Sequence, residues 1–264
     1  MPSRGTWARR DVAAKLSVNV NKIATVRNSR GGSIPSVVQA VDVCINAGSP
    51  GITVHPRGDE RHIRADDVRE LARHLASRRD RVEFNVEGDP RPDFIALVLE
   101  VRPHQCTLVP VKAGEITSQA GWSPDSRSEA LLRAVADLRA AGVRVSLFVD
   151  PEEEPIRWAA AAGADRVELY TEPFARAYEQ GALAGEASFA VYAAAARLAA
   201  SLGLGVNAGH DLDLENLRLF HALPHLDEVS IGHALVSQAL FVGLDRAVRD
   251  YLAALGGTKI VGDA

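Results

Sequence analysis

Eight short apolar runs alternate with amphipathic segments along this chain, and this alternation constrains the fold more than any other sequence feature. Between the runs, apolar residues recur at helical spacing, as in Val68, Leu71, Ala72 and Leu75. Strands that alternate with helices predict parallel βαβ units. The expected strands are Leu16–Val20, Gly51–Val54, Val82–Val86, Cys106–Pro110, Val143–Val149, Arg166–Tyr170, Leu204–Asn207 and Glu228–Ile231.

Glycines near the ends of the helical segments support the same scheme. Gly48, Gly142, Gly163 and Gly203 each come shortly before an expected strand, where a left-handed C-cap glycine ends a helix. An open doubly wound sheet would instead carry a glycine-rich phosphate loop after its first strand, and residues 21–25 contain no glycine. We therefore predict an α/β fold, a parallel eight-stranded (β/α)8 barrel with extra helices. It would be a single domain over residues 15–264, after a flexible extension of residues 1–14.

Composition excludes several classes of function. The 264 residues include 30 basic and 34 acidic side chains, which are interspersed and predict neither a nucleic-acid-binding stripe nor a membrane-binding face. No apolar run approaches the roughly 20 residues of a membrane span. The first residues, Met1 to Arg10, lack the apolar stretch of a signal peptide, which favours a cytoplasmic protein. Cys44 and Cys106 form no CxxC motif and are expected to be buried.

Two Gly-His pairs near the C-terminal end of the chain indicate a phosphate site. Gly209-His210 and Gly232-His233 each end an expected strand shortly before a helix. A helix N-terminus offers unpaired backbone N–H groups to an anion. Two such sites on consecutive strand–helix units are typical of phosphate binding in a barrel.

Carboxylates within the strands are the next informative feature. In the third strand, Glu83, Asn85 and Glu87 alternate with apolar residues, and Glu168 repeats the pattern in the sixth. One face of a barrel strand meets the helices and the other meets the lumen, so these carboxylates should face the lumen or its mouth. Because buried carboxylates are costly without partners, they favour a functional polar centre. The alternative is the exposed face of an edge strand.

His55 directly follows the second strand and begins the charged loop of residues 56–62. Such a loop belongs at the catalytic face of a barrel, where His55 could exchange protons and Arg57 could hold a phosphate or carboxylate. Arg27 and Arg30, after the first strand, also suit an anionic substrate, although exposed arginines are common. Four histidines could meet in space, but without carboxylates at clear spacing we predict no metal site. They are His55, His62, His210 and His233.

Several long motifs resemble the pyridoxine 5′-phosphate synthase family. That resemblance covers residues 15–254 and implies a (β/α)8 barrel assembled as a homo-octamer, a tetramer of dimers. It also implies condensation of 3-amino-2-oxopropyl phosphate with 1-deoxy-D-xylulose 5-phosphate to pyridoxine 5′-phosphate, phosphate and water, with no organic cofactor or metal. The motifs are residues 17–31, Gly51-Ile52-Thr53-Val54-His55-Pro56-Arg57, Arg61-His62-Ile63, Val206-Asn207-Ala208-Gly209-His210 and Ile231-Gly232-His233-Ala234.

The resemblance also implies roles for individual residues. His55 and Glu83 would accept protons, His210 would donate one, and Glu168 would stabilise charge in the transition states. Two groups of residues would bind the substrates. The amino-ketone phosphate would be held by Asn19, Asp211, Gly232 and His233, and the deoxyxylulose phosphate by Arg30, Arg57, His62 and Thr117.

The sequence departs from the family pattern at two places. Asn21-Lys22 stands where the pattern has Asp-His; the pair could still hold a sugar phosphate but puts a proton relay there in doubt. Asp211 stands where the pattern has Gly. A carboxylate beside a phosphate would repel it unless it turns away, and the alternative is that Asp211 caps the following helix.

Two other functions remain compatible with a barrel. A sugar-phosphate aldolase or epimerase working through a Schiff base would need a lysine, for which Lys112 and Lys22 are the candidates. A non-catalytic barrel that binds a phosphorylated metabolite would need arginines and backbone amides. It would have no use for four acid–base groups together, namely His55, Glu83, Glu168 and His210.

Overall fold

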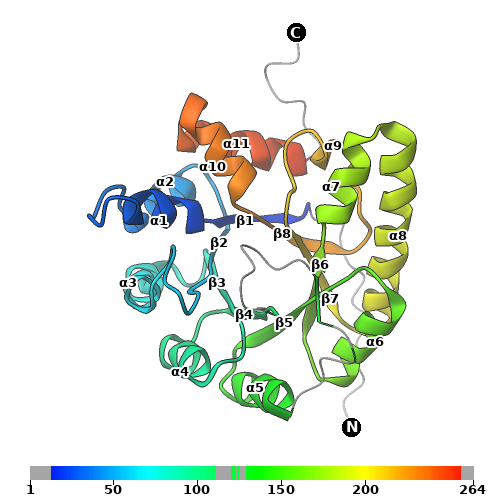
Figure 1. Cartoon of the computed structure of the whole chain (residues 1–264), viewed down its shortest axis with the longest axis horizontal. Coiled ribbons are helices and arrows are strands. Elements are labelled where there is room, and N and C mark those ends of the chain that lie inside the picture. The colour runs from blue at the N-terminus through cyan, green and yellow to red at the C-terminus, as the bar shows by residue number, and fades with distance from the viewer. Residues whose placement is uncertain (1–12, 111–119, 123, 125–128, 257–264) are drawn as a thin grey trace.

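Eight parallel strands close into a barrel, which confirms the predicted fold (Figure 1). The computed structural model describes residues 13–110, 120–122, 124 and 129–256. The strands pair in chain order, and β8 returns to pair with β1. They are β1 (Lys15–Asn19), β2 (Gly51–Val54), β3 (Glu83–Gly88), β4 (Gln105–Leu108), β5 (Arg144–Val149), β6 (Arg166–Tyr170), β7 (Gly205–Gly209) and β8 (Leu226–Ile231).

Helices surround the barrel, and their apolar faces form the core against the outward-facing strand residues. On α3 the predicted stripe is confirmed, since Val68, Leu71 and Leu75 are buried. The helices are α1 (Asn21–Asn28), α2 (Val37–Asn46), α3 (Ala65–Leu75), η1 (Ala76–Arg78), α4 (Pro92–Val101), α5 (Glu129–Ala140), α6 (Glu153–Ala161), α7 (Glu172–Glu179), α8 (Ala182–Ser201), α9 (Leu217–Phe220), α10 (His233–Val242) and α11 (Leu244–Leu255).

The expected helix ends are confirmed at the glycines. Gly48, Gly142, Gly163 and Gly203 all have positive φ angles, between 79° and 107°. A left-handed residue at this position turns the chain from the helix into the next strand without the strain that a Cβ would cause.

The lumen is filled by polar side chains, as the alternation of Glu83, Asn85 and Glu87 predicts. The carboxylate of Glu83 on β3 contacts Lys15 on β1, and that of Glu87 contacts Ser230 on β8. These pairs join strands that are not neighbours in the sheet, so the contacts must cross the lumen. Polar side chains therefore lie along the lumen from Glu83, near the N-terminal end of the barrel, to Glu87, near its C-terminal mouth.

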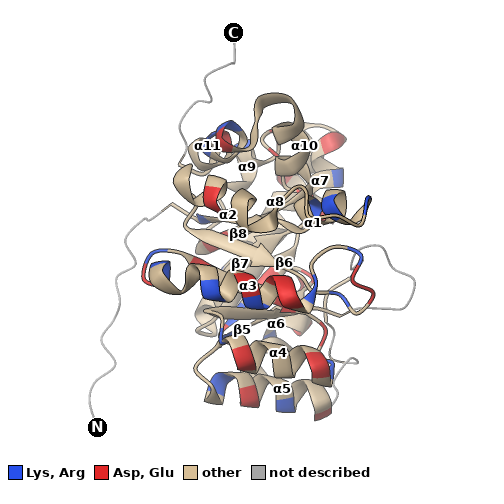
Figure 2. Cartoon of the chain, turned by 90° about the vertical axis from the view of Figure 1, so that its left-hand side faces the viewer, with Lys and Arg blue, Asp and Glu red and all other residues tan. Residues whose placement is uncertain are grey.

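The outer surface has the mixed charge that the composition predicts. Acidic and basic residues are interspersed along the helices drawn in Figure 2. Within the described ranges, none of the helices combines the length and apolar composition needed to span a bilayer. Cys44 and Cys106 are buried and unpaired, as expected, and burial raises the pKa of both thiols. The expected extension of residues 1–14 lies almost wholly outside the described residues.

Candidate active site

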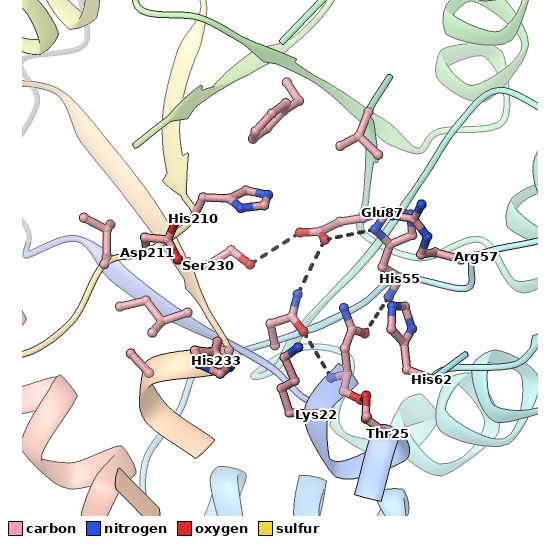
Figure 3. Close-up of a pocket in the computed structure, with 18 of the residues that line it drawn as sticks. Lys22, Thr25, His55, Arg57, His62, Glu87, His210, Asp211, Ser230 and His233 are labelled. Carbon is pink, nitrogen blue, oxygen red and sulfur yellow. Dashed lines mark hydrogen bonds and ion pairs between the residues drawn. The ribbon is translucent and has the colours of Figure 1, made fainter. Parts of the chain in front are cut away.

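A cavity of about 490 Å³ opens at the C-terminal ends of the strands, where barrel enzymes place their active sites. Its walls come from the strand ends and from the loops and helices that follow them (Figure 3). The lining residues are Asn19, Asn21, Lys22, Thr25, His55, Arg57, Arg61, His62, Glu87, Val109, Phe148, Glu168, His210, Asp211, Leu212, Ser230, Ile231, Gly232, His233 and Ala234.

His55 and Glu87 form the polar centre of this cavity. Nδ1 of His55 lies 3.9 Å from Oε2 of Glu87, and both side chains are about nine-tenths buried. Ser230 donates from its hydroxyl to Oε1 of Glu87 at 3.4 Å, and Asn19 donates to Oε2 at 3.5 Å. The backbone N–H of His55 donates to Oδ1 of Asn21 at 2.9 Å. Both groups are thus held from several strands and from α1.

Burial changes the protonation of both groups. It raises the pKa of Glu87 to about 8; the hydrogen bond from the Ser230 hydroxyl opposes this increase, and the nearby Glu228 carboxylate adds a smaller one. Burial also holds the pKa of His55 well below its usual value, and the electrostatic influence of the neighbouring His62 ring and of the Arg57 guanidinium lowers it further. Nε2 of His55 is buried and has no hydrogen-bond partner among the described residues. The lowered pKa therefore favours the neutral imidazole of His55, and no described residue occupies the hydrogen-bonding position of its Nε2.

Glu168 lies deeper in the lumen, on β6. Burial raises its pKa well above the usual value, and the carboxylates of Glu87 and Glu228 add to the rise. The Thr107 hydroxyl donates to Oε2 of Glu168 at 3.5 Å. On β7, Gly209 leaves the room that Oε1 of Glu168 occupies, because a Cβ at this position would collide with that oxygen. Glu168 is thus a carboxylic acid kept close to neutral, which can donate a hydrogen bond.

His210 lies on the opposite side of the cavity from His55 and packs against two aromatic rings. Its ring centroid is 5.3 Å from those of Phe148 and Tyr170, and burial lowers its pKa. Its backbone has a φ of 84°, which is unusual for a residue with a Cβ. The Thr171 hydroxyl donates to the carbonyl oxygens of Gly209 and His210 and so holds this turn.

The cavity wall near α10 resembles the predicted phosphate site. His233 is the first residue of α10, and both His233 and Gly232 line the cavity. A Cβ on Gly232 would come within 3.0 Å of Asn19, so only glycine allows β1 and β8 to approach here. Asp211 also lines the cavity, with a φ of 54°. The alternative that Asp211 caps the following helix is wrong. The carboxylate that accepts backbone N–H groups before α9, those of residues 215 and 216, belongs to Asp213.

The structure corrects the placement of Glu83. This residue begins β3 at the N-terminal end of the barrel, next to Gly51, and its carboxylate pairs with Lys15 and Arg144. Glu87 comes four positions later on the same strand, about 13 Å further along the lumen. The expectation that Glu83 shares the site with His55 is therefore wrong, and Glu87 is the carboxylate of β3 that reaches the cavity.

The structure does not place two other expected ligands in the cavity. Arg30 follows the end of α1, is exposed and does not line the cavity, and its expected contact with the deoxyxylulose phosphate stays a prediction. Thr117 lies outside the described residues, as does Lys112. The remaining expected site residues all line the cavity: Asn19, Asn21, Lys22, His55, Arg57, His62, Glu168, His210, Asp211, Gly232 and His233.

Sequence reasoning missed several lining residues, notably Ser230 and Phe148, and it expected Glu87 in the lumen without giving it a role. The alternating pattern of the third strand did contain a signal for Glu87. The expected strand ended at Val86, whereas β3 runs on to Gly88 and therefore includes Glu87. The member of the alternating set nearest the C-terminal end of the strand is the one at the mouth. In the described part of the chain, no group of three or more His, Cys, Asp or Glu residues is arranged to hold a metal ion.

Comparisons with known proteins match nearly the whole chain to one family. The family model of the pyridoxal phosphate biosynthesis protein PdxJ matches residues 16–257. Pyridoxine 5′-phosphate synthase from Bacteroides fragilis is 53% identical over 238 residues, which cover 90% of this chain and 97% of the relative. The same enzyme from Leptospira biflexa is 48% identical over 251 residues, covering 91% of this chain and 96% of the relative.

Solved structures with low identity share the fold alone. A phosphoribosylanthranilate isomerase from Thermotoga maritima superposes with a TM-score of 0.56 at 11% identity, covering 92% of this chain and 99% of that chain. The YdjI aldolase from Escherichia coli K12 gives a TM-score of 0.57 at 12% identity, covering 95% and 92%.

Proposed function

The chain belongs to the family of the pyridoxal phosphate biosynthesis protein PdxJ, and on this basis we propose how its cavity makes pyridoxine 5′-phosphate. The reaction condenses 3-amino-2-oxopropyl phosphate with 1-deoxy-D-xylulose 5-phosphate and releases phosphate and water. It is the pyridoxine 5′-phosphate synthase step of vitamin B6 biosynthesis. The observation that carries the assignment of roles is the enclosure of His55, Glu87 and His210 around one cavity lined by cations.

Ring formation makes specific demands on such a cavity. The amine of the amino-ketone adds to the carbonyl of the sugar phosphate to give a Schiff base. Protons must then leave carbon, and hydroxyl and phosphate groups must depart. Each of these steps is accelerated by a positioned acid or base whose pKa lies near the working pH.

His55 and Glu87 are proposed as the proton acceptors, so that Glu87 takes the role first assigned to Glu83. A pKa of about 8 suits Glu87 to exchange protons near neutral pH. The unpaired Nε2 of His55 can accept a proton from a substrate. Their separation of 3.9 Å allows the Glu87 carboxylate to stabilise the imidazolium that results.

His210 is proposed as the proton donor to a leaving hydroxyl. Burial lowers its pKa, which makes its protonated form a stronger acid than an exposed histidine. Glu168, whose carboxyl group is held neutral, is proposed to donate a hydrogen bond to developing negative charge. Placing His210 and the His55–Glu87 pair on opposite walls separates the acid from the base.

The two phosphate groups are proposed to bind at opposite ends of the cavity. The N-terminus of α10, with Gly232 and His233, and Asn19 would hold the amino-ketone phosphate. The cations and donors on α1 and on the loop after β2 would hold the deoxyxylulose phosphate: Asn21, Lys22, Arg57 and His62. Binding energy from these remote phosphates can then orient the reacting carbons.

The function is tested by supplying purified protein with both substrates. Pyridoxine 5′-phosphate and inorganic phosphate should appear in equal amounts, and each substrate alone should give neither product. A borohydride-trapped adduct on Lys22, with no pyridoxine 5′-phosphate, would instead establish the Schiff-base aldolase alternative. Saturable binding of both phosphates without turnover would establish the non-catalytic alternative.

We further propose a homo-octamer in the cytoplasm, on the basis of the family resemblance. Exposed apolar side chains support an assembly of copies, since Leu240 and Phe241 at the end of α10 are 76% and 89% exposed. Light scattering of purified protein tests the assembly. A monomer at micromolar concentration would contradict it.

A further inference from the structure

Helix α1 contacts the loop between β2 and α3 at three backbone positions. At the start of the loop, Asn21 accepts from the N–H of His55 at 2.9 Å. At the other end of α1, the Asn28 amide donates to the carbonyl oxygen of Glu60 at 3.2 Å and to that of His62 at 2.8 Å. Arg27 also donates from Nη2 to the carbonyl of His62, at 3.3 Å. The loop that carries the expected anion-binding side chains is thus fixed by one helix.

Arg27 is itself fixed by a buried ion pair with Asp67 of α3. Both residues are 8% exposed, and both nitrogens of the Arg27 fork donate to the two oxygens of Asp67, one of them at 2.9 Å. Oδ2 of Asp67 also accepts from the N–H of Arg64 at 2.8 Å, where the loop enters α3. Nε of Arg27 donates to Oδ1 of Asn28 at 3.0 Å, which orients the amide that holds His62.

These contacts fix the peptide group between His62 and Ile63 on both sides. Its carbonyl accepts from Asn28 and Arg27, and its N–H donates to Nδ1 of the His62 ring at 2.9 Å. In a trans peptide the C=O and N–H point in opposite directions, so fixing the carbonyl also fixes the N–H. Because Nδ1 is an acceptor here, the neutral ring carries its proton on Nε2. Ile63 anchors the same unit, since it is fully buried.

We propose that Arg27 and Asn28 are positioning residues that hold His62 as a neutral Nε2–H donor toward an anionic substrate in the cavity. His62 lines the cavity beside His55 and Arg57 (Figure 3). A neutral donor binds a phosphate through one directed hydrogen bond. The positive charge that attracts the phosphate then comes from Arg57 and Lys22. Identification of the anion as deoxyxylulose phosphate rests on the proposed function, whereas the fixed tautomer does not.

Asn28→Ala is the test variant, and Ser29→Ala is the matched control. Asn28→Ala removes both amide contacts to the loop but leaves the Arg27–Asp67 pair. Ser29 is the next residue, and among the described residues its hydroxyl donates to the carbonyl of Val26 in α1, not to the loop. In Asn28→Ala the KM for deoxyxylulose phosphate should rise about tenfold, while the KM for the amino-ketone phosphate and kcat remain close to those of the parent protein. Ser29→Ala should change none of these values.

The tautomer provides a readout that does not require turnover. In the ¹⁵N-labelled protein, the ring nitrogens of His62 should show a protonated Nε2 and a bare Nδ1, and in Asn28→Ala they should move toward a mixture. Arg27→Lys keeps the positive charge but loses the paired guanidinium nitrogens, and it should give the same change in the His62 spectrum. Asn28→Gln keeps the amide group and should restore part of the parent spectrum.

Three results would overturn the proposal: a protonated Nδ1 in the parent protein, an unchanged His62 spectrum in Asn28→Ala, or equal losses for both substrates. If the parent protein makes no pyridoxine 5′-phosphate but the His62 spectra respond as expected, the proposed reaction fails while the positioning role stands.

Discussion

Nδ1 of His55, at the end of β2, lies 3.9 Å from Oε2 of Glu87, near the end of β3. The two residues stand side by side on neighbouring strands, because Val54 pairs with Val86 in the register of the sheet. Adjacent parallel strands therefore deliver an imidazole and a carboxyl group to the same level of the lumen. This level lies at the mouth of the barrel, and the chemistry proposed for the cavity depends on His55 and Glu87 meeting there.

Replacing His55 by Asn should lower turnover by roughly 10²–10⁴ if its imidazole accepts a proton from the substrate. Asn keeps a polar side chain of similar reach but cannot take up a proton. The measurement is kcat/KM across pH for both proteins. A nearly normal rate for His55→Asn would remove this residue from the mechanism.

The raised pKa of Glu87 predicts a pH-dependent contribution to stability. Its folded pKa of about 8 lies above the ordinary value of 4.5, so the folded protein keeps a proton that the unfolded chain releases. The contribution is fully present below the unfolded pKa and is lost as pH rises toward about 8, by at most about 1.4 kcal/mol per pH unit.

Glu87→Gln should remove this loss. Urea unfolding at pH 5 and pH 8 should show a smaller decrease in the free energy of unfolding for Glu87→Gln than for the parent protein. The other titrating groups are present in both proteins, so the difference reports the titration of Glu87 together with its effect on the pKa of Glu168. Equal decreases would show that Glu87 titrates with an ordinary pKa in the folded state.

Asp211→Gly should improve both stability and phosphate binding. Its φ of 54° favours glycine, so removing the Cβ should stabilise the fold by about 1 kcal/mol, and loss of the carboxylate removes repulsion of a bound phosphate. Asp211→Asn separates the two effects, because it removes the charge and keeps the Cβ. A lower KM for the amino-ketone phosphate in both variants, with a higher melting temperature only in Asp211→Gly, is the expected pattern. An unchanged KM in both would place the phosphate elsewhere.

Gly209→Ala should impair turnover through Glu168. The added Cβ would collide with Oε1 of Glu168, so this carboxyl group must leave its position in the lumen. We expect a loss of about 10²-fold in kcat, from misplacement of a group that stabilises charge. Gly32→Ala is the control, because open space surrounds a Cβ there. Full activity of Gly209→Ala would show that the position of Glu168 is unimportant.

The fold was predictable because each strand–helix unit carries its own local signals. The apolar stripe of α3 and the glycines that end the helices depend only on nearby residues. Most of the cavity was also predictable, because the residues that follow parallel strands meet at one end of a barrel. His55, His210 and His233 all follow this rule.

The error at Glu83 has a physical cause. Alternation along a strand identifies and orders the side chains that face the lumen, but it does not tell which of them lies level with a given residue of another strand. That level depends on the register between strands, which places Glu83 beside Gly51 and Asn85 beside Thr53. The contact between Arg27 and the loop after β2 could not be predicted from the sequence either. Arg27 is held by Asp67, which comes 40 positions later in the chain.

The central claim is tested most directly by comparing Glu87→Gln with Glu83→Gln in the formation of pyridoxine 5′-phosphate from both substrates. The two variants make the same chemical change at two levels of one strand. Glu87→Gln should lose roughly 10²–10⁴ of the turnover. Glu83→Gln should keep most of the turnover and instead melt at a lower temperature, because Arg144 and Lys15 lose their carboxylate partner. Loss of turnover in Glu83→Gln with normal turnover in Glu87→Gln would contradict the account.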